Sequence, residues 1–131
     1  MQLNPKYVSF ADKVLIDVPC SGLGIIRKKP EIKWNKSRKS LKDLVPTQRE
    51  IMENAWTYLK SGGTMLYSTC TLNVEENQDN IEWFLNNHKD AKVEKIFLGN
   101  MDNFMYNNDG SLTILPNEYM DGFYVAKIIK K

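Results

Sequence analysis

The residues of this chain best suited to covalent chemistry are its two cysteines, and each follows a short run typical of a buried β-strand. Cys20 comes shortly after the run 13–17, and Cys70 comes after the run 64–68. In open α/β sheets, ligands bind in the crevice outside the carboxyl ends of the strands. If the two strands are neighbours, both thiols face one crevice, where a thiolate can act as a nucleophile.

The residues around the cysteines sharpen this hypothesis. Asp17 ends a hydrophobic strand, where an unpaired carboxylate is costly, so it either caps the turn that follows or has a chemical role. Asn73 and Glu76 have the spacing of a capping box, which predicts that a helix starts at Asn73 and that Cys70 faces its amino end. The helix dipole there favours the thiolate. Pro19, followed by small residues, lets a flat ligand approach, so these groups together suit covalent chemistry on a planar, polar substrate.

Other uses of the two cysteines stay open. Two small buried cysteines that only fill strand ends would give the same spacing. A metal site is disfavoured because the sequence has no C-x-x-C spacing and His88 lies at a predicted helix end. A disulfide is disfavoured because so few cysteines suit a reducing cytosol, and the flanks of Cys20 and Cys70 fit no redox motif.

The strands that position these residues follow an α/β order, with parallel strands first and an antiparallel pair at the end. The continuous apolar run 13–17 predicts a strand buried on both faces, as in a parallel sheet. Further strands are predicted over 64–68, 91–98, 112–115 and 123–129, with an exposed loop over 99–110.

Two helices are predicted between these strands. The first begins at about Leu44, with Pro46 in its first turn, and ends at the glycine pair 62–63. The second spans 73–88 and is expected to turn Val74 toward the core.

Length and composition fit one globular domain. The chain has 131 residues, of which 42% are hydrophobic and 26% charged, and a net charge of +2. We interpret residues 1–12 as a lead-in and 13–131 as the domain. No apolar run approaches the ~20 residues of a membrane span, and the start of the chain has no signal-peptide pattern. We therefore expect a cytoplasmic protein.

Two longer motifs resemble those of a known enzyme family. The sequence DVPCSGLG at 17–24 is similar to the fourth motif of the RNA 5-methylcytosine methyltransferases. The segment 62–71, followed by EEN at 75–77, is similar to their sixth motif. The segments 25–34 and 121–127 resemble the Sun/Fmu (RsmB) branch, which methylates small-subunit ribosomal RNA. The resemblance covers nearly the whole chain.

This resemblance implies a fold, an activity and a set of roles. The fold is that of a Rossmann-like, S-adenosylmethionine-dependent methyltransferase, of which this chain is the C-terminal part. The reaction is methylation of carbon 5 of cytosine. The resemblance implies that Cys70 is the nucleophile and that Cys20 assists release of the methylated product. It also implies that Asp17 contacts the cytosine edge and that Pro19 shapes the base pocket through its backbone carbonyl.

A cluster of positive charge lies between the two motifs. The segment 27–42 holds eight of the 18 Lys and Arg residues. A run of charge is often only a solvated loop. Beside a nucleotide pocket, however, Arg27, Lys28 and Lys29 would contact phosphates, and Trp34 would stack on a base or anchor the loop. We therefore expect RNA, ribosomal in this branch, as the partner, with neither a membrane nor a metal. The pocket sequence leaves transfer RNA open as the substrate, and nothing indicates an oligomeric state.

The residues of a methyl-donor site are not found among the 131. Such a site needs a glycine-rich loop after a first strand and an acid at the end of a second strand. The family pattern places its first three motifs before Met1, so Asp17 is expected here only as a wall of the donor pocket. We expect this chain alone to be inactive and to bind S-adenosylmethionine weakly. A function of another class also stays open, namely a non-catalytic RNA-binding or assembly module that has kept the fold.

Overall fold

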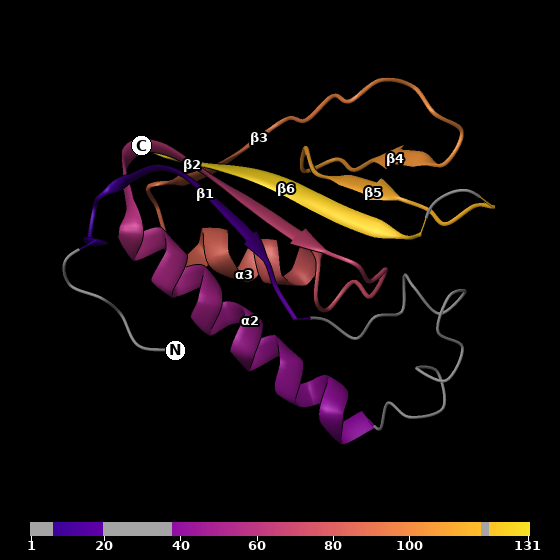
Figure 1. The fold of residues 1–131 in the computed structure, drawn as a ribbon, viewed down its shortest axis with the longest axis horizontal. Coiled ribbons are helices and arrows are strands. Elements are labelled where there is room, and N and C mark those ends of the chain that lie inside the picture. Colours follow the sequence, from indigo (N-terminus) through magenta and orange to yellow (C-terminus); the bar gives the residue numbers. More distant parts are fainter. Residues whose placement is uncertain (1–6, 20–37, 119–120) are drawn as a thin grey trace.

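One mixed sheet and two helices make up the described part of the chain (Figure 1). The computed structural model describes residues 7–19, 38–118 and 121–131, with the backbone alone over 38–43. Within these residues the strand order is β1-β2-β6-β5-β4, and β3 pairs with β6 beside β5. The elements are β1 (Ala11–Asp17), α2 (Arg38–Tyr58), β2 (Leu59–Thr69), α3 (Gln78–Asn87), β3 (Ala91–Glu94), β4 (Phe104–Tyr106), β5 (Leu112–Ile114) and β6 (Phe123–Lys130). No helix in these ranges is long and apolar enough to cross a membrane.

The pairing of the strands confirms the predicted α/β class. β1 and β2 are parallel, with Asp17 opposite Ser68 at their carboxyl ends. β2 and β6 are antiparallel, and so are β5 and β6. The two strands that precede the motifs at Cys20 and Cys70 are therefore direct neighbours in the sheet.

Burial along β1 alternates from one residue to the next. Ile16 is 8% exposed and belongs to the core, whereas Leu15 is 71% exposed. The prediction that this strand is buried on both faces is wrong. Both helices lie on the same face of the sheet (Figure 1), so successive side chains alternate between the helix-covered face and the opposite one, called here the open face.

Helix α2 is longer than the sequence predicted. It begins at Arg38, so the predicted start at Leu44 is wrong, and Pro46 lies inside the helix instead of in its first turn. Proline removes one helical hydrogen bond, which is why its position favours a helix start just before it. The residues ahead of it include arginine, lysine and leucine, which are good helix formers. Met52 and Trp56 are buried and lie on the side of the helix that faces the sheet.

The prediction that the glycine pair 62–63 ends this helix is wrong. The helix ends at Tyr58, and β2 begins directly at Leu59 and runs through both glycines. The glycines serve the strand pairing instead. Gly62 has a positive φ of 85°, and a Cβ at Gly63 would lie 2.8 Å from the carbonyl oxygen of Asp12 in β1. Only glycine lets the two backbones approach this closely.

Helix α3 begins later than predicted. Its first residue is Gln78, so the start at Asn73 is wrong, although the predicted end near His88 is confirmed. The Asn73 side chain does accept a hydrogen bond from the backbone N–H of Glu75 at 3.1 Å. The residues between them and α3 form hydrogen-bonded turns and not a helix. Val74 is consequently 52% exposed instead of turned toward the core.

The later strands differ from prediction mainly in length. The strand predicted over 91–98 ends at Glu94, and the segment 99–110, predicted as a loop, contains β4. β4 has only three residues and is held by pairing with β5, which no local pattern signals. The strands predicted over 112–115 and 123–129 agree with β5 and β6 to within one residue.

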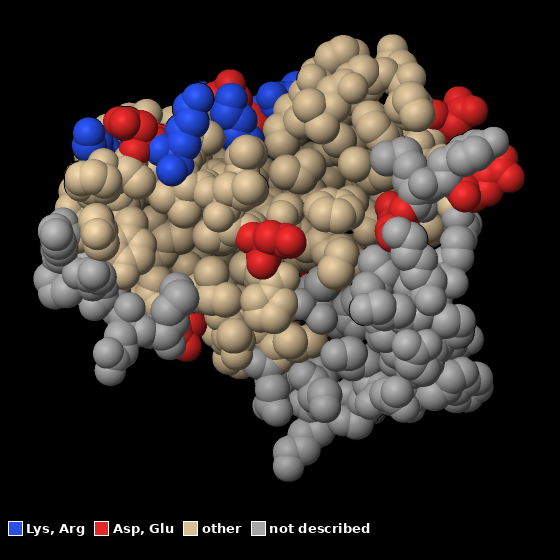
Figure 2. All heavy atoms as spheres, in the orientation of Figure 1, with Lys and Arg blue, Asp and Glu red and all other residues tan. Residues whose placement is uncertain are grey.

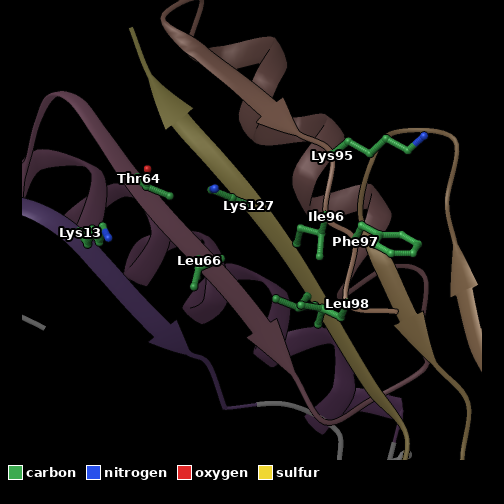
Figure 3. Close-up of a pocket in the computed structure, with 9 residues that line it drawn as sticks. Lys13, Thr64, Leu66, Lys95, Ile96, Phe97, Leu98 and Lys127 are labelled. Carbon is green, nitrogen blue, oxygen red and sulfur yellow. The ribbon is translucent and has the colours of Figure 1, made fainter. Parts of the chain in front are cut away.

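The open face carries an open hollow of about 520 Å³ (Figure 3). Its floor is formed by Thr64 and Leu66 of β2 and Val125 of β6, and Ile96 and Leu98 form one wall. Lys13, Lys95 and Lys127 also line it. Figure 2 shows the visible lysine and arginine side chains gathered on the sheet side of the molecule, next to acidic ones.

Because β1 is buried on one face only, neighbouring substitutions should differ strongly in their effect on stability. Ile16→Ala removes buried methyl groups and should lower the free energy of unfolding by about 2–5 kcal/mol. Leu15→Ala should change it by less than about 0.5 kcal/mol, because that side chain is already largely in water. Urea unfolding of both variants measures the difference. Equal losses would contradict the one-sided core.

Candidate functional site

A hydrogen bond joins the two strand ends that carry the motifs. The Ser68 hydroxyl donates to a carboxylate oxygen of Asp17 at 3.3 Å. The backbone N–H of Val18 donates to the carbonyl of Ser68 at 3.2 Å, which extends the ladder one residue beyond β1. Alternation along the strands places both Asp17 and Ser68 on the open face. The carboxylate is exposed, so the cost of burying a charge, which suggested a role for it in the sequence, does not apply here.

Cys70 is held between two buried threonines. Thr69 and Thr71 are both 0% exposed, and Cys70 itself is half-buried. The Thr69 hydroxyl donates to the side-chain oxygen of Asn77 at 2.6 Å, and the Asn77 amide donates to the carbonyl of Thr71 at 2.9 Å. The backbone on either side of the thiol is therefore fixed by one buried asparagine.

A buried carboxylate lies behind this segment. Glu76 is 0% exposed. Its two oxygens accept hydrogen bonds from the side-chain amides of Gln48 at 3.0 Å and Asn73 at 2.8 Å. Its backbone carbonyl accepts one from the Tyr67 hydroxyl at 2.6 Å. Asn80 donates to the same hydroxyl at 3.1 Å, so the polar groups form one connected network on the helix-covered face.

The structure brings together part of the predicted site. Asp17 ends β1 and Cys70 directly follows β2, and these two strands are neighbours, which is the condition that the sequence analysis set. Pro19 is exposed and lies two residues after the end of β1, and its carbonyl accepts a hydrogen bond from Gln48 at 2.9 Å. The predicted roles of Cys20, Arg27, Lys28, Lys29 and Trp34 fall on residues outside the described ranges.

The expected helix amino end beside Cys70 has to be corrected. That expectation assumed a helix starting at Asn73, three residues after the thiol. α3 begins at Gln78, and the intervening segment is a turn. The argument from sequence for a dipole-stabilised thiolate therefore loses its premise, and Cys70 is distinguished instead by its position and its fixed flanks. Among the described residues, no group of three or more His, Cys, Asp or Glu could hold a metal ion.

Sequence reasoning missed the residues that hold the site. Glu76 was expected to serve a helix start, and Asn77 and Asn80 were assigned no role. One signal was present, because Gln48 falls at a helical spacing otherwise occupied by apolar residues. A polar side chain at a core position needs buried partners, and that requirement is met here by Glu76 and Asn80.

Comparison with protein families and curated proteins gives one consistent result. The family model described as 16S rRNA methyltransferase RsmB/F matches residues 2–129. Ribosomal RNA small subunit methyltransferase B of Shewanella oneidensis is 38% identical over 120 residues, covering 91% of this chain and 27% of that protein. The protein of the same name from Pasteurella multocida is 40% identical over 130 residues, covering 98% of this chain and 28% of that protein. The chain thus spans just over a quarter of the length of these relatives.

Solved structures agree with the fold. A crystal structure of PH0851 superposes with a TM-score of 0.84 at 35% identity, covering 94% of this chain and 27% of that one. The structure of NSun6 from Pyrococcus horikoshii with SFG, an analogue of S-adenosylmethionine, has a TM-score of 0.74 at 32% identity. It covers 92% of this chain and 30% of that one.

The flanks of Cys70 generate a stability prediction. Thr69→Val keeps the shape of the side chain but leaves the Asn77 oxygen without its buried donor, so we expect a loss of about 1–3 kcal/mol in the free energy of unfolding. Thr57→Val is the matched control, because the Thr57 hydroxyl bonds a carbonyl of its own helix and is only half-buried. Denaturant unfolding measures both. A loss at Thr69 no larger than that at Thr57 would contradict the assigned role.

Proposed function

Because the chain belongs to the 16S rRNA methyltransferase RsmB/F family, we propose that it carries the base-modifying groups of an RNA cytosine-5 methyltransferase. The observation that carries this proposal is the bond between Ser68 and Asp17. It joins the ends of two neighbouring parallel strands, and the half-buried thiol of Cys70 follows two residues later. A carboxylate and a thiol at one end of such a sheet lie where open α/β sheets bind their ligands.

The proposed chemistry requires a nucleophile because carbon 5 of cytosine is too weak a nucleophile to take a methyl group unaided. The Cys70 thiolate adds to carbon 6, and the electron pair displaced from the 5,6 double bond makes carbon 5 nucleophilic. Carbon 5 takes the methyl group and then loses its hydrogen to a base. The double bond reforms as the bond between carbon 6 and sulfur breaks, which returns the thiolate.

Three further residues have proposed roles at the base. The exposed carboxylate of Asp17 hydrogen-bonds the cytosine edge and stabilises protonation of a ring nitrogen as the adduct forms. The Pro19 carbonyl shapes the base pocket. Cys20 assists release of the methylated product, in keeping with its place in the fourth motif.

S-adenosylmethionine supplies an electrophilic methyl group when it is bound. Only a fraction of a site for it fits the residues of this chain. Asp17 is an exposed acidic side chain at the carboxyl end of β1, and it suits a pocket wall. The sequence has no glycine-rich loop that would receive the donor.

RNA is the proposed substrate, and ribosomal RNA is favoured by the names of the relatives. The basic segment 27–42 supplies the charge to hold phosphates, with Arg27, Lys28 and Lys29 nearest in sequence to the fourth motif and Trp34 available for stacking. The test of the function is methyl transfer to small-subunit ribosomal RNA by the full-length gene product that carries this chain, mapped to one cytosine. Transfer only to transfer RNA, or none, would overturn the proposed substrate or activity.

The two cysteines predict opposite outcomes in that assay. Cys70→Ala removes the nucleophile and should lower methyl transfer by at least about 10³-fold. Cys20→Ala should instead accumulate a covalent protein–RNA adduct, visible as a band that survives denaturing electrophoresis. Near wild-type transfer by Cys70→Ala would refute covalent catalysis by this thiol, and clean release by Cys20→Ala would remove the role given to that residue.

The basic segment predicts a change in salt dependence. Replacing Arg27, Lys28 and Lys29 by Gln should weaken binding to a ribosomal RNA fragment, and each lost phosphate contact should reduce the slope of log K against log salt by about 1. The control variant replaces three other lysines. Lys60 lies at the opposite end of the sheet, and Lys89 and Lys92 follow α3. An unchanged slope in the first variant, or an equal change in both, would show that the segment does not contact RNA phosphates specifically.

A further inference from the structure

Gln48 connects helix α2 to the loop that follows β1. Its side chain is 0% exposed. Its amide nitrogen donates to the carbonyl oxygen of Pro19 at 2.9 Å and to Glu76 at 3.0 Å, so both N–H groups are used. Its oxygen accepts a hydrogen bond from Asn80 at 2.9 Å. Every polar atom of this side chain therefore has a partner, which fixes its orientation.

Glu76 continues the connection to the loop that follows β2. The carboxylate oxygen that does not bind Gln48 accepts a hydrogen bond from Asn73 at 2.8 Å. Asn73 follows Cys70 by three residues, and its backbone N–H donates to the Thr71 hydroxyl at 3.2 Å. A chain of hydrogen-bonded side chains, of which Gln48 and Glu76 are buried, thus runs from the Pro19 carbonyl to the segment that begins with Cys70.

Burial makes each hydrogen bond of this connection costly to lose. A buried carboxylate that lost a donor, or a buried amide that lost an acceptor, would have no water to replace it. Pro19 itself is exposed, and its ring has no N–H with which to continue the strand ladder beyond Val18. The hydrogen bond to its carbonyl comes from the helix side, from Gln48, which lies 29 positions away in the sequence.

We propose that Gln48 is a positioning residue, which sets the Pro19 carbonyl relative to the segment that carries Cys70. Glu76 and Asn80 hold the Gln48 amide in the orientation that aims one N–H at Pro19. The catalytic meaning of this placement rests on the proposed function, in which the Pro19 carbonyl shapes the base pocket. The placement itself is a property of this chain and can be measured without RNA or a methyl donor.

The sharpest variant exchanges the two polar partners. Gln48→Glu combined with Glu76→Gln keeps volume, net charge and the hydrogen bond between positions 48 and 76. It also keeps acceptors for Asn73 and Asn80. Of the contacts described above, the one that it removes is the donor to the Pro19 carbonyl, which now faces a carboxylate oxygen. If the exchange does not fold, Gln48→Met removes the donor to Pro19 together with the contacts to Glu76 and Asn80. The test is then the rise in the Val18 exchange rate beyond any rise at Ala126.

Hydrogen exchange followed by NMR on the 131-residue chain reads the result. The backbone N–H of Val18, bonded to Ser68, reports on the end of β1, and the N–H of Ala126 in the centre of β6 reports on the whole sheet. Release of the neighbouring carbonyl should raise the Val18 exchange rate by about fivefold, the factor expected for one hydrogen bond, and leave Ala126 unchanged. A purely structural role would raise both rates together.

Controls separate the outcomes. Glu53→Gln, on the same helix, disturbs the contact with His88 at 2.8 Å and should change neither rate at the end of β1. An unchanged Val18 rate in the exchanged variant, or equal increases at Val18 and Ala126, would overturn the proposal and leave the proposed function standing. In the full-length gene product, the exchanged variant should also transfer methyl groups more slowly than Glu53→Gln. Local release without slower transfer would refute a role in the reaction.

Discussion

A buried carboxylate can be tolerated only if its oxygens are hydrogen-bonded, and this requirement organises much of the molecule. Glu76 lies fully inside the protein, and its partners come from a helix and from a turn. Its backbone carbonyl receives the hydroxyl of Tyr67 from the centre of the sheet. α2, β2 and the segment before α3 are thereby joined to one residue, and the apolar core packs around a polar centre instead of excluding it.

The two faces of the sheet carry different polar groups. Tyr67 and Thr69 point to the helix-covered face, where they join the buried network. Ser68, between them, points to the open face and contacts Asp17. Strand alternation alone separates these groups. The segments that resemble the fourth and sixth motifs contribute to both faces, with Asp17 and Ser68 on the open face and Tyr67 and Thr69 on the helix-covered one.

The sequence predicted all the described strands except β4, but it did not predict the polar scaffold. Apolar runs identified both parallel strands, and the positions of the two cysteines after them predict a site at their carboxyl ends. The helix starts predicted from Pro46 and Asn73 were wrong, because a proline or a capping residue signals a local preference that tertiary packing can override. Gln48 and Glu76 are 28 positions apart, and no local pattern shows that two such residues meet. The roles of Cys20 and the basic segment remain predictions.

Alternation along β1 also constrains how this segment can change in length. Asp17 reaches the open face because it is an odd number of residues from Ile16, whose side chain lies in the core. One inserted residue between the core of the strand and its end would turn the carboxylate toward the helices and away from Ser68. Two inserted residues would restore its direction. Length variation in this strand is thus limited by parity, and single-residue insertions should be purged more strongly than paired ones.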